Sequence, residues 1–159
     1  MPYETFQQKC RRTLVLGVGN TLRRDDGVGH AIVEALRQRD FPDAQVASVH
    51  QLTPELADDL SASDVVVFVD ATVDAKDLVV ATVQPEDTVS SPLDHATEPA
   101  GLVAFTRQQY GRAPEAWVVG IPAHDLGHGE GLSDKTLPYL KPAIEAVTRI
   151  IVQPCTSSL

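Results

Sequence analysis

The stretch from residue 14 to residue 36, LVLGVGNTLRRDDGVGHAIVEAL, constrains the fold more than any other part of the chain. It begins with the apolar run Leu14–Leu16, which is typical of a strand buried on both faces of a parallel sheet. Glycines then permit a tight turn, the adjacent carboxylates of Asp25 and Asp26 follow, and from Val28 onward apolar residues recur with helical spacing. Strand, polar loop and helix in this order place the acidic pair at the carboxyl end of the strand, the edge where open α/β sheets bind ligands.

Two other interpretations of this stretch have to be weighed. A dinucleotide-binding loop is disfavoured, because Leu22 stands where the fingerprint needs its third glycine and because two aspartates would repel a pyrophosphate. A structural role remains open, in which Asp26 only caps the helix that follows.

The rest of the chain alternates strand and helix patterns. Strands are expected at 13–19, 44–49, 64–70, 79–84 and 116–121, and helices at 27–39, from 54 onward, at 98–110 and toward the C-terminus. The unbroken run Val65–Val69 belongs in the middle of a parallel sheet, whereas the short link before Val79 favours antiparallel pairing for that strand. Pro138 and Pro142 delay or bend the start of the last helix. We predict one α/β domain over residues 1–159, with three layers: a twisted, mostly parallel sheet of about five strands and helices on both faces.

Composition excludes several classes of function. A net charge of −9 over 159 residues argues against nucleic acids and anionic membranes as partners. No apolar run approaches the roughly 18 residues of a membrane span, and residues 1–12 lack the apolar core of a signal peptide. The two cysteines, Cys10 and Cys155, form no C-x-x-C motif, which excludes a thiolate zinc site and favours a reducing cytoplasm.

Further polar residues fall at positions where strands end or helices begin. Asp70 closes the strongest strand, and His95 precedes the helix expected at 98–110. On pattern alone, Asp70 either serves a site or ties down the next loop, and a lone loop histidine is more often solvated than a ligand. His50 is likewise best explained as a polar residue at a strand end, and His124 and His128 remain open as extra ligands.

The segment GVGNTLRRDDGVG resembles the opening motif of the hydrogenase maturation proteases, G-[IV]-G-N-x-L-x-x-D-[DE]-G-x-G. Its fixed positions are met by Gly17, Gly19, Asn20, Leu22, Asp25, Asp26, Gly27 and Gly29. Two further segments extend the resemblance over most of the chain. Val69-Asp70-Ala71 matches the family's strand ending, and residues 129–133 match its G-x-G-L-S turn before a terminal amphipathic helix.

The resemblance implies an endopeptidase, of the aspartyl type, that trims the C-terminal extension from the large-subunit precursor of a [NiFe] hydrogenase. It implies that Asp26, Asp70 and His95 are both the metal ligands and the catalytic residues, and that they recognise nickel already seated in the precursor. The free protein, which we expect to be a cytoplasmic monomer, is expected to bind another divalent ion only weakly at this site, so that much of it stays empty. The chain departs from the family where Asp26 replaces a frequent Glu and where Asp94 replaces the usual Ser before the histidine.

Two carboxylates and one imidazole suit Ni, Zn, Mn or Fe, and three protein ligands leave coordination positions open. The sequence carries neither a G-x-S-x-G elbow nor an H-E-x-x-H helix. Hydrolysis therefore depends either on a metal-polarised carbonyl or bound hydroxide, or on Asp25 or Asp70 as general base.

Two functions compete with this one. Peptidyl-tRNA hydrolases also open with a strand and a G-[LV]-G-N turn, but they continue with a Tyr and an Arg-His-Asn segment where this chain reads Thr-Leu-Arg-Arg-Asp-Asp. The charge of −9 also suits tRNA poorly. A hydrogenase chaperone or metal carrier that docks without cutting would need the same site, so the sequence leaves it open.

Overall fold

The computed structural model describes residues 11–85 and 95–154. Cys10, Asp94 and Cys155, and with them most of the loop before His95, lie outside these ranges. Five strands form one sheet in the order β2-β1-β3-β5-β4. Their bounds are β1 Thr13–Val18, β2 Ala44–Val49, β3 Val65–Thr72, β4 Val79–Val83 and β5 Glu115–Pro122. All neighbouring strands are parallel except β4, which pairs antiparallel with β5 at one edge of the sheet.

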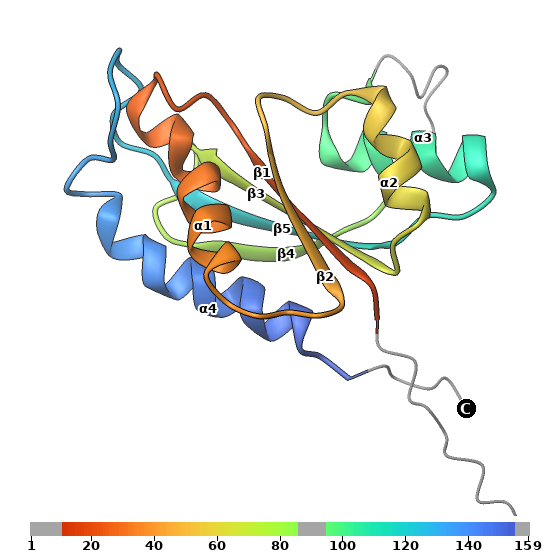
Figure 1. Cartoon of the computed structure of the whole chain (residues 1–159). Coiled ribbons are helices and arrows are strands. Elements are labelled where there is room, and N and C mark those ends of the chain that lie inside the picture. The colour runs from red at the N-terminus through yellow and green to blue at the C-terminus, as the bar shows by residue number, and fades with distance from the viewer. Residues whose placement is uncertain (1–10, 86–94, 155–159) are drawn as a thin grey trace, which may run out of the picture.

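Helices cover both faces of the sheet, as Figure 1 shows. One face carries α1, Val28–Arg37, and α4, Leu140–Ile151, and the other carries α2, Ala57–Ser61, and α3, Pro99–Tyr110. Short 3-10 turns precede three of them: η1 Arg24–Gly27, η2 Pro54–Leu56 and η4 Leu137–Tyr139. The predicted three-layer α/β fold is confirmed, and α4 begins late, at Leu140, with Pro138 just before it and Pro142 in its first turn.

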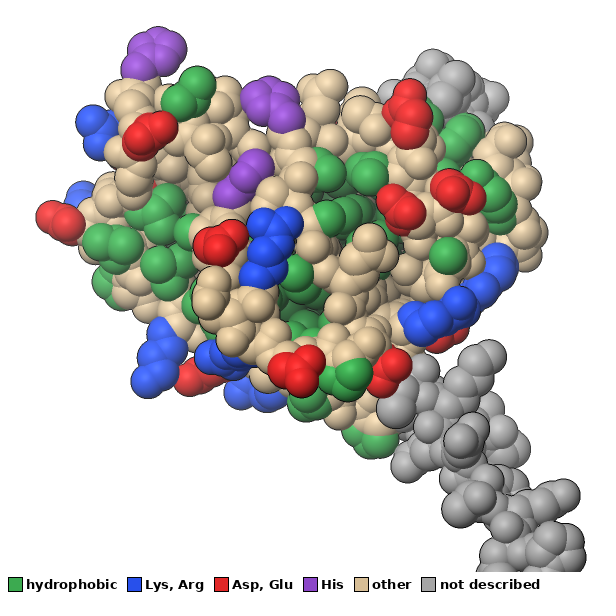
Figure 2. Space-filling model, viewed as in Figure 1, with side chains coloured by type: hydrophobic (Ala, Val, Ile, Leu, Met, Phe, Trp, Pro, Cys, Tyr) green, Lys and Arg blue, Asp and Glu red, His purple; other side chains and the backbone are tan. Residues whose placement is uncertain are grey.

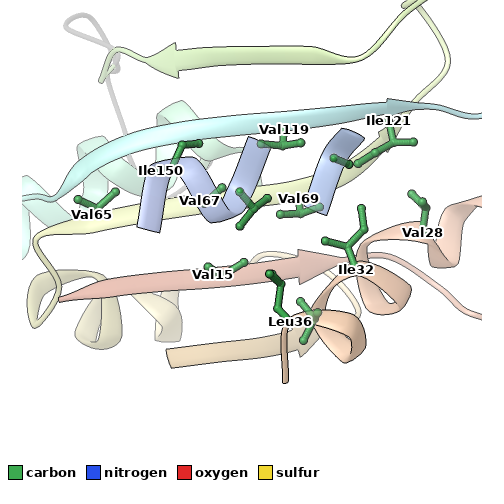
Figure 3. Close-up of a cluster of buried hydrophobic side chains, with 13 residues drawn as sticks. Val15, Val28, Ile32, Leu36, Val65, Val67, Val69, Val119, Ile121 and Ile150 are labelled. Carbon is green, nitrogen blue, oxygen red and sulfur yellow. The ribbon is translucent and has the colours of Figure 1, made fainter. Parts of the chain in front are cut away.

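Alternation along β3 decides which side chains meet which helices. Val65, Val67 and Val69 join the core under α1 and α4 (Figure 3), and Val66 and Phe68 join the core under α2 and α3. The core under α1 and α4 also contains side chains from β1, β5 and both helices, among them Val15, Val28, Ile32, Leu36, Val119, Ile121 and Ile150. Because successive strand residues face opposite sides of the sheet, the side chain of Asp70, which follows Val69, points to the α3 face.

Two glycines let α1 start directly against the backbone of the sheet. A Cβ on Gly17 would lie 2.4 Å from the carbonyl oxygen of Gly29, and a Cβ on Gly29 would lie 2.5 Å from that of Val69. No side chain fits in either space. This close approach brings the connection between β1 and α1 beside the carboxyl end of β3, where Asp70 lies.

The surface carries its negative charge in a dispersed form. Acidic and basic side chains are interspersed on the face shown in Figure 2, and hydrophobic side chains form the floor of a hollow near its centre. Within the described ranges, none of the helices has both the length and the apolar character that crossing a bilayer requires.

Candidate functional site: two carboxylates at the sheet edge

Asp26 is held against the turn that leaves β1. The backbone N–H of Asn20 donates to Asp26 Oδ2 at 2.8 Å. Gly19 has φ +140°, and a Cβ there would lie 1.9 Å from the carbonyl oxygen of Asp26, so the turn requires glycine. The N-cap of α1 is Gly27, and no side chain caps that helix. The capping interpretation of Asp26 is therefore wrong, and its half-buried carboxylate faces the turn at the sheet edge.

Asp70, at the carboxyl end of β3, is near enough to Asp26 for the negative charge of Asp26 to affect its pKa. Burial raises the pKa of Asp70. The N–H of Ala71, which donates to Asp70 Oδ1 at 2.7 Å, lowers this pKa, and the negative charge of Asp26 raises it. The resulting pKa is about 6. A like charge raises a carboxyl pKa in this way only from nearby. The charge of Asp26 therefore acts on Asp70 at the carboxyl edge of the sheet, and a bound cation would offset the negative charge of both.

His95 is exposed and lies four residues before the start of α3. Its carbonyl accepts a hydrogen bond from the N–H of Glu98 at 3.1 Å, and a Cβ on Gly101 would lie 1.9 Å from the same oxygen. Glycine at this position of α3 lets the His95 backbone rest against the helix. The residues that follow it, Thr97 to Pro99, line the same cavity as Asp70.

Within residues 11–85 and 95–154, no three His, Cys, Asp or Glu side chains stand close enough together to hold a metal ion. Joint ligation by Asp26, Asp70 and His95 therefore stays a prediction. Of the three, Asp70 alone lines the cavity beside α3, and Asp26 is near enough for its charge to act on Asp70. The donor chemistry fits a hard or borderline divalent ion, because carboxylate oxygens and an imidazole nitrogen are hard to borderline donors.

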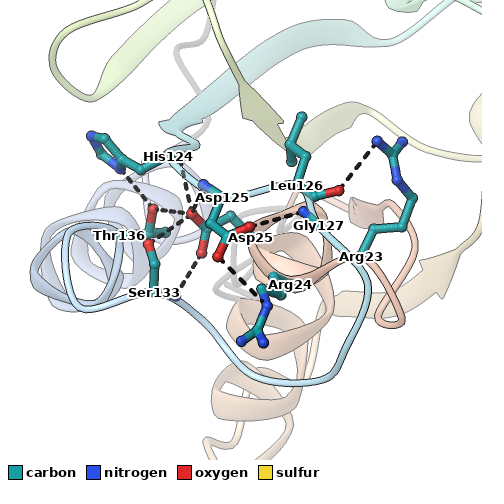
Figure 4. A network of polar contacts seen from close by, with 9 residues as sticks. All are labelled: Arg23, Arg24, Asp25, His124, Asp125, Leu126, Gly127, Ser133 and Thr136. Carbon is teal, nitrogen blue, oxygen red and sulfur yellow. Dashed lines mark hydrogen bonds and ion pairs between the residues drawn. The ribbon is translucent and has the colours of Figure 1, made fainter.

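Asp25, the other half of the acidic pair, is completely buried, with 0% of its surface exposed. Figure 4 shows its carboxylate at the centre of a network of polar contacts. It accepts hydrogen bonds of 2.7 to 2.9 Å from three backbone N–H groups and two hydroxyls: those of His124, Asp125, Ser133 (N–H and Oγ) and Thr136 (Oγ1). Burial alone would raise the pKa of Asp25, but these hydrogen bonds outweigh it and lower the pKa to about 2. The hydrogen bonds of Asp25 therefore hold the loop after β5 in place. Its low pKa makes it a very weak base.

The network also determines that Nδ1 of His124 carries a hydrogen. Thr136 Oγ1 lies 2.9 Å from Asp25 Oδ2, from the carbonyl oxygen of Pro122 and from His124 Nδ1. The hydroxyl has a single proton, and both oxygens are acceptors, so His124 Nδ1 must donate to it. The ring also stacks on Tyr139, with centroids 6.5 Å apart. All four candidate histidines are exposed: His50, His95, His124 and His128.

Sequence reasoning did not identify the partners of Asp25. The available signal was the G-x-G-L-S match, because Ser133 in that turn supplies two of the five hydrogen bonds. The turn was matched only as a family feature, and nothing in its spacing assigns Ser133 to a carboxylate about a hundred residues earlier.

The sequence matches no protein-family model and no curated protein. The structure, in contrast, is similar to several solved structures over most of its length. The hydrogenase-maturating endopeptidase HybD from E. coli is 27% identical, with a TM-score of 0.72 over 88% of this chain and 91% of that one. An endopeptidase from Escherichia coli is 28% identical, with a TM-score of 0.64 over 86% and 89%. The [NiFe] hydrogenase maturation protease HycI from Thermococcus kodakarensis shares the fold at 21% identity, with a TM-score of 0.69 over 90% and 94%.

Proposed function

Because the structural homologues across most of this chain are hydrogenase maturation proteases, we propose that it is an endopeptidase of hydrogenase maturation. It removes the C-terminal extension of a [NiFe]-hydrogenase large-subunit precursor after nickel insertion. We place this activity in the cytoplasm and assign it to the monomer.

One observation carries the proposal: Asp26 and Asp70 both lie at the carboxyl edge of the sheet, near enough for the charge of Asp26 to act on Asp70. Burial and, to a smaller extent, the negative charge of Asp26 raise the pKa of Asp70, and both effects favour a partner that brings positive charge. Nickel held in the precursor is such a partner. With His95 as a third ligand, the protein offers an incomplete coordination shell that another protein's metal can complete.

The two general-base candidates differ in their suitability. A catalytic base works best when its pKa is near the working pH. The pKa of Asp70 is about 6, so near neutral pH the group is largely ionised and still basic enough to accept a proton from water. Asp25, with a pKa of about 2 and every oxygen occupied by hydrogen bonds, cannot serve. We therefore assign proton acceptance, if a side chain performs it, to Asp70.

Processing is tested by incubating the protein with a client precursor and following the mass of the large subunit. We expect Asp26→Ala and His95→Ala to lose processing and to keep the fold, because both side chains lie at the edge of the sheet rather than in its core. His50→Ala is the matched control, since His50 is also an exposed histidine at the carboxyl edge. Full processing by both site variants would contradict the assignment, and stable binding of the precursor without cutting by the unaltered protein would favour the chaperone.

The free protein should bind divalent ions more tightly as pH rises from 5 to 7. A proton on Asp70 competes with the metal, and the pKa of about 6 places the change in this window, where the ionised fraction rises about tenfold. Calorimetric titration with Ni²⁺ measures it. Asp70→Asn should remove both the affinity and its pH dependence, and a pH-independent affinity would exclude Asp70 as a ligand.

A further inference from the structure

A cavity of about 280 Å³ opens beside Asp70, between the sheet and the start of α3. Its apolar walls come from three adjacent strands and the link into α2, and most of these side chains are nearly or fully buried. The residues that line it include Val18, Leu52, Phe68, Val118, Gly120 and Thr97. At this size it lies just below the roughly 300 Å³ lower limit of small-molecule sites, so it suits a side chain rather than a nucleotide.

The cavity exists because β5 has a glycine opposite the site carboxylate. The strand register pairs Gly120 with Asp70 on one side and with Val79 on the other. Since Val119 belongs to the core under α1 and α4, alternation turns the Cα–H of Gly120 to the α3 face. A Cβ there would lie 3.3 Å from Thr72 Cγ2 and 3.4 Å from Val79 Cβ, so a methyl group is nearly tolerated and a larger side chain would fill the cavity.

The chemistry of the walls selects what enters. Val18, Leu52 and Phe68 offer no hydrogen-bond partner to a polar group, which makes burial of one costly. Asp70 at the wall disfavours an acidic side chain. A medium-sized apolar side chain, in contrast, is stabilised by about 25 cal/mol for each Å² that it removes from water.

We propose, on the basis of the proposed function, that this cavity receives an apolar side chain of the precursor next to the bond that is cut, and that Gly120 sets its size. The substrate chain then runs past the carboxylates with one side chain anchored under α3. Gly120 acts on specificity through space and touches no reacting atom.

The first test needs no precursor. The ¹⁵N-labelled full chain is titrated with N-acetyl-leucine methylamide, and the aspartate and lysine analogues are the comparison probes. We expect saturable shifts at the amides of Thr97 and Gly120 with the leucine probe, with a dissociation constant on the order of millimolar, and none with the aspartate probe. Stronger binding of the lysine or aspartate probe, or shifts confined to other residues, would overturn the proposal.

Variants then separate the cavity from the fold. Gly120→Val should abolish the shifts with the leucine probe, and Gly120→Ala should weaken them. Ala81→Val is the matched control, because Ala81 lies in the neighbouring strand β4, is exposed and does not line the cavity. Unchanged leucine binding in a folded Gly120→Val would refute the role of Gly120, and the alanine variant provides the same answer if the valine variant does not fold.

The second test uses the precursor. Gly120→Val should lower kcat/KM by about tenfold or more, the usual effect of a few methylenes in an apolar pocket. Replacing the apolar precursor residue beside the cut with alanine should restore part of the loss in the variant and slow the unaltered protein. Equal rates for both proteins on every precursor would contradict the proposal. If the unaltered protein cuts no precursor, the proposed function fails instead, and the titration still decides whether the cavity binds an apolar side chain.

Discussion

A precursor that lacks nickel is expected to be cut at least about a hundredfold more slowly than a loaded one. If Asp26, Asp70 and His95 recognise nickel in the substrate, only the loaded precursor gains the metal–ligand interaction, and the two forms differ in affinity by that free energy. A single carboxylate–metal bond worth about 3 kcal/mol already corresponds to more than a hundredfold, because about 1.4 kcal/mol is tenfold. Mass spectrometry of the large subunit, with and without nickel loading, measures the ratio.

Two results would contradict this view. Equal cutting of loaded and empty precursors would make the three residues an ordinary catalytic site that ignores the metal of the substrate. Cutting of the empty precursor after nickel is added to the protease alone would make the ion a cofactor of the enzyme. The two carboxylates are consistent with recognition of nickel in the substrate, because their like negative charges favour a positive ion that the substrate brings.

Asp25→Ala should destabilise the protein by about 3 to 5 kcal/mol, one of the largest effects available in this chain. The change removes the acceptor of five hydrogen bonds and leaves three backbone N–H groups and two hydroxyls to find other partners in a buried space. For a chain of this length such a loss lowers Tm by about 10 °C or more. Chemical denaturation and thermal melting of the variant measure it.

Asp125→Ala is the matched control, because Asp125 belongs to the same network but its side chain is 48% exposed. It forms an ion pair with Arg24 at 3.5 Å and accepts the N–H of Gly127 at 2.9 Å. Contacts this exposed contribute little, so a loss below about 1 kcal/mol is expected. A similar loss in both variants would show that the network, rather than the buried carboxylate, provides the stability.

Asp25 also makes stability depend on acid. Its pKa falls from 3.8 to about 2 on folding, so its contribution is complete above pH 3.8 and is lost as the pH falls through about 2. The shift corresponds to about 2 kcal/mol. The unaltered protein should lose more stability over this interval than Asp25→Ala does, when both are measured by urea denaturation.

Most of the architecture was predictable from local patterns. The glycines and apolar spacing of residues 14–36 predict the strand, turn and helix that became β1, η1 and α1. The β-branched run of Val65–Val69 predicts the central position of β3, and the short link before Val79 predicts the antiparallel β4. These features depend on neighbours in the sequence, which is why pattern reasoning finds them.

The division of labour between Asp25 and Asp26 was not predictable. Both are carboxylates on one short loop, and both match the family motif. They lie in the 3-10 turn η1, where successive side chains point about 120° apart because there are three residues per turn. One therefore enters the interior and the other stays at the edge. Which one turns inward depends on the donors of the loop after β5, and those donors come from a distant part of the sequence.

The long sequence separation between Asp25 and its partners affects when these contacts form during synthesis and folding. Asp25 joins residues 99 to 111 positions further along the chain, so its ring of contacts closes a loop of more than a hundred residues, and such long-range contacts form late. During synthesis at about 5 to 20 residues per second, the carboxylate stays in water until Ser133 and Thr136 have left the ribosome. The 3-10 turn η1, which carries both Asp25 and Asp26, is thus secured only after residues 133 and 136 have been made, and the edge of the sheet that carries Asp26 is completed late.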